Sequence, residues 1–177
     1  MKSRIACVAV ALVALLSGCS GQPDPSDSTP AFATEQEAFA AAEQTYRNYV
    51  DALNQVDLSD PATFEEVYRW TTGDANAGAR KTFTQMHADG WTVTGQSSAS
   101  VVAPMPNNLN WSTKVLLAAC LDVSLVHVVD SNGESQVSVE RGSVQSMLIS
   151  LASSPSSGTH WLVSDVEGRS GEPSCGG

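Results

Sequence analysis

The pattern of apolar and polar positions predicts a helical first half of the chain, beginning with one long amphipathic helix. Thr34 and Glu37 form a capping box, and an apolar stripe at spacings of three and four residues follows it to about Asn54. The stripe consists of Phe39, Ala42, Tyr46, Val50 and Leu53. This spacing places the five side chains on one face of a helix.

Two shorter helices are predicted after the first one. Asp60 followed by Pro61 is typical of an N-cap and a first-turn proline, and the helix that they begin stops near Gly73. The next helix spans residues 75–89 and ends at Gly90, where a left-handed residue is favoured. The apolar faces of these helices are Phe64, Val67 and Tyr68 in the first, and Ala79, Phe83 and Met86 in the second.

Beyond Gly90 the hydrophobic period changes from 3.6 to 2, which predicts strands. Short strands are expected over residues 91–94 and 99–102, interrupted by Gly95 and Pro104. A long β-rich run over residues 113–130 leads into Asn132-Gly133, a strong hairpin signal. The expected partner strand runs from residue 136 to about 151, antiparallel to the first.

The last predicted strand spans residues 160–167 and completes the fold class. It alternates Leu162 and Val166 on one side with Trp161 and Val163 on the other. Three helices followed by a curved antiparallel sheet make an α+β fold, and residues 34–177 are enough for one domain.

The first 18 residues have the pattern of a removable lipoprotein signal peptide. Lys2 and Arg4 precede an apolar run over residues 5–16, which is too short to span a bilayer as a helix. The run ends in Leu-Ser-Gly-Cys, which resembles the bacterial lipobox and predicts lipidation of Cys19. Acyl chains such as palmitate would hold the chain at the extracytoplasmic face of the cell membrane. The alternative is a conventional signal in which Cys19 is incidental.

A polar segment and a strong negative charge follow the signal. Residues 19–33 are rich in Ser, Pro, Asp and Gly, and we expect a lipidated cysteine followed by a flexible tether. Removal of Lys2 and Arg4 with the signal takes the formal charge from −10 to −12. This charge disfavours nucleic acids as partners, because phosphates repel an acidic surface, although acidity is also common for solubility alone.

Cys120 and Cys175 are the remaining thiols of the mature chain. Because an exported chain meets an oxidising compartment, we expect a disulfide between them, with two free cysteines as the alternative. His87, His127 and His160 are scattered and form no metal-binding motif, so no metal and no cofactor is expected.

The order of elements resembles the NTF2-like superfamily, which has the cystatin-like fold. The resemblance is carried by the Tyr46 helix, the segment Ala-Cys-Leu-Asp-Val-Ser at 119–124, the Asp-Ser-Asn-Gly turn at 130–133 and the segment His-Trp-Leu-Val-Ser-Asp-Val-Glu at 160–167. The chain also resembles small exported lipoproteins of high-GC Gram-positive bacteria. Such folds have a cavity between helix and sheet, and their exposed sheet face allows a homodimer.

The resemblance implies candidate catalytic residues, because NTF2-like enzymes use an Asp or a His in that cavity for proton transfer. Asp122 shares a strand face with Cys120, and a carboxylate inside an apolar cone would have a raised pKa and could act as a general base. Tyr46 is the candidate second polar group. The alternative for Asp122 is a hydrogen bond to a loop amide or a place at a bulge.

These observations leave three hypotheses about function. The first is a non-catalytic, membrane-anchored binding or accessory domain for a protein partner or a small apolar ligand. The second is a small enzyme of the isomerase or hydrolase type that uses Asp122 and Tyr46 in the cone cavity. The third is an accessory subunit of a cell-envelope transport or secretion complex, in which the acidic surface meets a basic partner.

Overall fold

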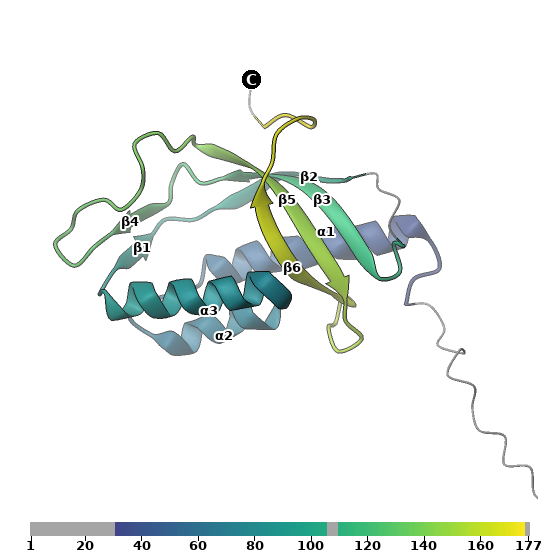
Figure 1. Ribbon diagram of the computed structural model, residues 1–177, viewed down its shortest axis with the longest axis horizontal. Helices are drawn as coiled ribbons and strands as arrows, with labels where there is room; N and C mark the ends of the chain where they lie inside the picture. Colours follow the sequence, from purple (N-terminus) through teal and green to yellow (C-terminus); the bar gives the residue numbers. More distant parts are fainter. Residues whose placement is uncertain (1–30, 106–109, 176–177) are drawn as a thin grey trace, which may run out of the picture.

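The computed structural model describes residues 31–105 and 110–175, and three helices pack there against a curved antiparallel sheet (Figure 1). The helices are α1 (Glu35–Leu53), α2 (Phe64–Arg69), preceded by the 3-10 turn η1 (Pro61–Thr63), and α3 (Gly73–Ala88). The strands are β1 (Thr92–Thr94), β2 (Ser98–Pro104), β3 (Lys114–Asp122), β4 (His127–Val129), β5 (Val144–Ser153) and β6 (Trp161–Gly168). The α+β fold class is therefore confirmed.

The predicted caps position the helices. The Glu37 amide donates to the Thr34 hydroxyl over 3.2 Å, and the Glu37 carboxylate accepts from the Ala33 amide over 2.9 Å. Asp60 caps the turn that begins at Pro61, as predicted. Gly90 has a φ of +69° directly after α3, in the conformation that a helix C-terminus favours for glycine.

The main sheet has the strand order β2-β3-β5-β6, and all its neighbours are antiparallel. Bulges bend it at two places, between Ala99 and Val101 in β2 and opposite Ser150 and Leu151 in β6. The long helix α1 crosses one face of this sheet, in agreement with the NTF2-like arrangement (Figure 1). β1 and β4 pair separately as a small two-stranded sheet.

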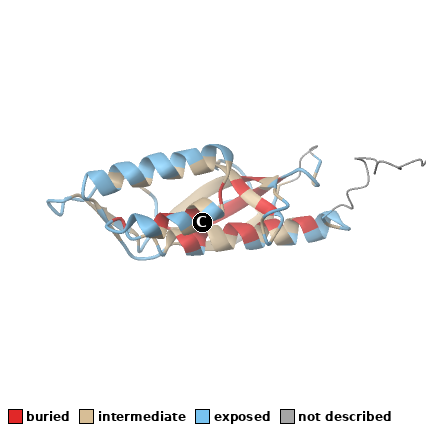
Figure 2. Ribbon diagram, turned by 90° about the horizontal axis from the view of Figure 1, so that it is seen from below, coloured by how far each residue is buried: buried red, intermediate tan, exposed pale blue. Residues whose placement is uncertain are grey.

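The core lies between α1 and the sheet. Alternate residues of β3, among them Val115, Leu117 and Ala119, face the stripe of α1, and Trp161 and Val163 join them from β6. In Figure 2 the buried residues of α1 lie along one side of the helix, whereas α3 has no fully buried residue. Most of the burial that stabilises the domain therefore comes from α1 and the four-stranded sheet.

The predicted hairpin differs from the observed connection. The Asp130–Gly133 turn does form, and the Gly133 amide donates to the Asp130 carbonyl over 3.0 Å, but strand pairing beyond it is limited to a single bridge between Val129 and Ser135. The long strand stops at Asp122, and its antiparallel partner in the main sheet begins only at Val144. The predicted strand over 113–130 is thus two strands in two different sheets.

The predicted facing of the last strand is wrong beyond Ser164. Ser150 pairs with Asp165 and Leu151 pairs with Val163, so Ser164 is an extra residue that reverses the alternation. As a result Val166 packs against the same core as Trp161 and Val163, and not on the side of Leu162.

The ordered domain begins before Thr34. The Phe32 ring stacks on Trp161 with centroids 5.8 Å apart and an angle of 4° between the planes, and it meets His160 edge-on. This contact fixes the chain just ahead of α1, within the segment predicted to be a flexible tether. Cys19 and the signal lie outside the described residues, and within the described part no helix is long and apolar enough to cross a membrane.

Candidate functional site

An apolar pocket of about 280 Å³ lies where the end of α1, α3 and the small sheet meet the far end of β3. Its lining comes mainly from valine, leucine, methionine and phenylalanine. The lining residues are Leu53, Asn54, Val56, Leu58, Phe83, Met86, Val93, Gly95, Ser97, Leu121, Val123, Val126 and Val128. The pocket is near the lower limit of the volumes usual for small-molecule sites, about 300 Å³.

A hydrogen-bonded pair joins the end of α1 to the linker before β2 and forms one wall of the pocket. The Asn54 side-chain amide donates to the Ser97 carbonyl over 2.8 Å, and its oxygen accepts from the Ser97 amide over 2.9 Å and from the Ser97 hydroxyl over 3.0 Å. Because Asn54 and Ser97 form hydrogen bonds with each other, the polar groups of this wall already have partners within the protein.

Another part of the lining depends on a close crossing of two segments. Gly95 has a φ of +82°, and a Cβ at this position would lie 1.7 Å from the Leu125 carbonyl oxygen. The Arg141 guanidinium donates to the carbonyls of Val123 over 3.0 Å and Val126 over 2.8 Å, which holds the same turn between β3 and β4. Glycine is required here because no side chain fits between the two backbones.

The predicted catalytic pair is not supported by the geometry. Val115, Leu117, Ala119 and Leu121 of β3 pack toward the core, so strand alternation places Asp122 on the outer face of the sheet. Tyr46 lies inside the core on α1, where burial and the neighbouring Tyr49 raise its pKa. The two side chains are therefore on opposite sides of the sheet, and neither lines the apolar pocket.

The expected raised pKa of Asp122 is also wrong. The Asp122 carboxylate accepts a hydrogen bond from the Ser124 amide over 2.9 Å, and this bond, helped by the Ser124 side chain, holds the pKa of Asp122 below its usual value. Asp122 ends the strand by capping a turn, which is the alternative role considered from the sequence. A carboxylate of this kind is ionised at neutral pH and is a weak base.

A disulfide joins Cys120 to Cys175, with a Cα separation of 5.4 Å. It fastens the C-terminal segment to the outer face of β3. Arg169 organises the same segment by donating to the carbonyls of Gly171 over 2.7 Å, Glu172 over 3.0 Å and Pro173. The disulfide lies on the face opposite the core, so its role in the domain is structural.

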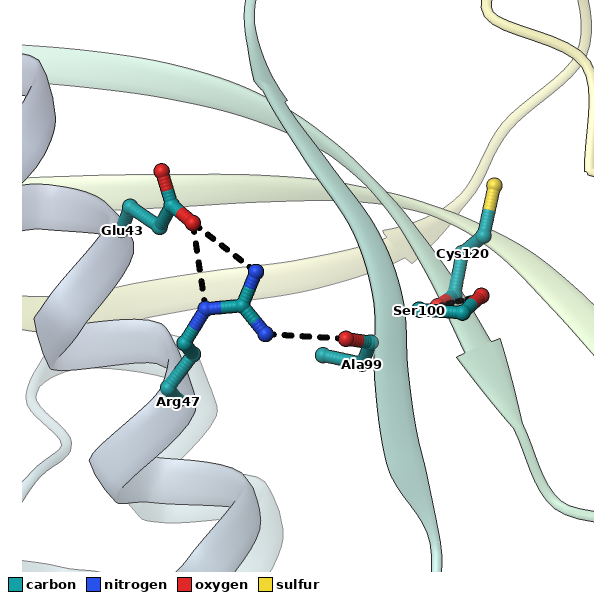
Figure 3. A network of polar contacts seen from close by, with 5 residues as sticks. All are labelled: Glu43, Arg47, Ala99, Ser100 and Cys120. Carbon is teal, nitrogen blue, oxygen red and sulfur yellow. Dashed lines mark hydrogen bonds and ion pairs between the residues drawn. The ribbon is translucent and has the colours of Figure 1, made fainter.

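The edge strand β2 is fastened to α1 by a second arginine (Figure 3). Arg47 forms an ion pair with Glu43 at 2.8 Å and donates to the Ala99 carbonyl over 2.9 Å, directly before the bulge at Ser100. The Ser100 hydroxyl donates to the Cys120 carbonyl over 3.2 Å. This network provides the Ala99 carbonyl of an edge strand with a hydrogen-bond partner. The strand follows directly after Ser97, which lines the pocket.

The three histidines belong to different parts of the fold, His87 to α3, His127 to β4 and His160 to the loop before β6. The His87 Nδ1 atom lies 2.6 Å from the Leu58 carbonyl oxygen, and His160 contacts Phe32 at the other end of α1. In residues 31–105 and 110–175, no group of three His, Cys, Asp or Glu side chains is arranged to hold a metal ion.

The residues that form the pocket were not predicted as site residues from the sequence. Valine and leucine on short strands are ordinary core residues in any pattern, and only the fold shows that they surround a space. The one local signal was Gly95 between two short strands, because a glycine there indicates a close approach of backbones.

No protein-family model matches the sequence, and no curated protein matches it. Among solved structures, the intermembrane-space region of the chloroplast protein ARC6 is similar at 14% identity and a TM-score of 0.47, over 73% of this chain and 94% of that one. CagV of Helicobacter pylori, a VirB8 homologue of a type IV secretion system, is similar at 9% identity and a TM-score of 0.46, over 72% and 95%. An IcmL-like type IV secretion protein of Legionella pneumophila is similar at 12% identity and a TM-score of 0.45, over 81% and 97%.

Proposed function

We propose that this protein is a lipid-anchored, extracytoplasmic binding protein whose apolar pocket takes a small apolar ligand. The observation that carries the proposal is the composition of the lining. None of the thirteen described residues around the pocket is ionisable, and its two polar side chains, those of Asn54 and Ser97, form a hydrogen bond with each other. Such a surface gains free energy by removing apolar groups from water, roughly 25 cal/mol per Å², and provides no acid or base.

Ligand binding is tested with the mature chain, residues 19–177, carrying Cys19→Ser so that no acyl chain competes for the pocket. Diphenylhexatriene is an uncharged, rod-shaped probe that fluoresces only in apolar surroundings. We expect saturable binding at one site per chain. Val126→Phe adds a ring to the lining and should weaken binding at least about tenfold, because the pocket is small.

Val139→Phe is the matched control, because Val139 is fully exposed and does not line the pocket. It should bind the probe as the parent chain does. Equal affinities of the Val126→Phe and Val139→Phe chains, both folded, would contradict the proposal.

The anchor is supported by the lipobox-like sequence before Cys19. In bacteria fed an alkyne analogue of palmitate, the wild-type chain should incorporate the label and sediment with membranes. Cys19→Ser should abolish both, since the thiol is the acceptor. Cys7→Ser, which changes the other N-terminal cysteine, should leave both intact. Labelling that persists in the Cys19→Ser chain would exclude this anchor.

A further inference from the structure

A second space, of about 290 Å³, lies between α1, α3 and β6, and its chemistry differs from that of the apolar pocket. Its lining combines two carboxylates, two aromatic rings and several small residues. The residues are Tyr49, Leu53, Asp74, Ala75, Gly78, Ala79, Thr82, Phe83, Asp165 and Val166, and we call this space the acidic groove.

The two carboxylates of the acidic groove have no cationic partner. The ion pairs of the described residues are Arg47 with Glu43 and Arg69 with Glu66, so neither Asp74 nor Asp165 is paired there. One oxygen of Asp165 accepts from the Val166 amide over 2.9 Å, which fixes the side chain. The groove therefore has a local negative charge that the protein does not neutralise.

Aromatic rings flank this charge from both helices. Tyr49 comes from α1 and Phe83 from α3, and the faces of such rings attract cations. The groove is also lined by small residues of α3, and a Cβ added at Gly78 would meet no atom within 4 Å. A space lined by two carboxylate residues without a cationic partner and by two aromatic residues suits an amine or a quaternary ammonium group.

The acidic groove adjoins the apolar pocket. Leu53 and Phe83 line both spaces, so these two side chains form the boundary between them. A molecule with an apolar body in the pocket could place its end group in the groove by passing these side chains. Neither side chain is fully buried, and both belong to helices with free space on the groove side.

We propose that the ligand is a cationic amphiphile, with its apolar body in the pocket and an ammonium group in the acidic groove, which Asp74, Asp165, Tyr49 and Phe83 line. This inference rests on the proposed function and adds the class of ligand to it.

The test compares three probes with the same body: diphenylhexatriene, its trimethylammonium derivative and its propionate derivative. The parent mature chain should bind the cationic probe about threefold to tenfold more tightly than the neutral one, and the anionic probe most weakly. The double variant Asp74→Asn and Asp165→Asn should lose this preference and still bind the neutral probe within about twofold.

The control is the double variant Asp51→Asn and Glu140→Gln, which changes the net charge equally at two exposed positions outside the groove. It should keep the preference for the cation. The inference is overturned if the cationic probe binds the parent chain no more tightly than the neutral one. It is also overturned if the control variant loses as much of the preference for the cationic probe as the groove variant does. If the parent chain binds no probe at all, the proposed function fails together with the inference.

Discussion

Two glycines with left-handed backbones have very different surroundings. Gly95 has a φ of +82° and faces the Leu125 carbonyl, whereas Gly133 has a φ of +84° with no atom within 4 Å of an added Cβ. Gly133→Ala should cost only the backbone strain, about 1 kcal/mol of unfolding free energy. Gly95→Ala adds a steric clash with backbone and should cost more than about 3 kcal/mol. Urea denaturation of both variants measures the difference, and equal losses would show that the crossing is not as close as described.

At the same scale, sequence reasoning favoured the wrong kind of residue for the site. It named Asp122, with Tyr46 as a second polar group, because the resemblance to NTF2-like enzymes implies an Asp or a His in the cavity. The structure places Asp122 at a turn and Tyr46 in the core, and the pocket is lined by residues that no motif distinguishes. The cysteine pair was predictable, because only two thiols remained for an oxidised chain.

At the scale of elements, the helices were predicted well because their signals are local. The cap at Thr34 and the turn that begins at Asp60 depend on contacts within a few residues, and both formed where the sequence placed them. The apolar stripe of α1 also identified the face that packs on the sheet, since Ala42, Tyr46 and Val50 are buried.

The strands were harder to predict from the sequence than the helices, because strand pairing depends on residues that are distant along the chain. β-propensity continues past Asp122, yet the carboxylate of that residue begins a turn, and the next strand pairs with β1 instead of continuing the main sheet. A single bulge at Ser164 reversed the facing of the end of β6. Neither event changes the composition of its segment, so the alternation of apolar residues alone could not predict it.

At the scale of the whole molecule, the two ends of α1 have different roles. Its N-terminal end follows Phe32, which stacks on Trp161, and Leu53 and Asn54 at its C-terminal end line the pocket. At 1.5 Å per residue, the 19 residues of α1 separate these ends by about 28 Å. The pocket therefore lies at the end of α1 opposite Phe32.

Whether the apolar pocket is the ligand site can be measured by locating a bound ligand. Methyl groups of the mature chain are observed by NMR before and after saturation with diphenylhexatriene. We expect shifts at Leu53, Met86, Val93 and Val126, which line the pocket, and none at Val115 or Leu151 in the core or at Leu148 on β5. Shifts confined to Leu148 and its neighbours, with the pocket methyl groups unchanged, would contradict this expectation.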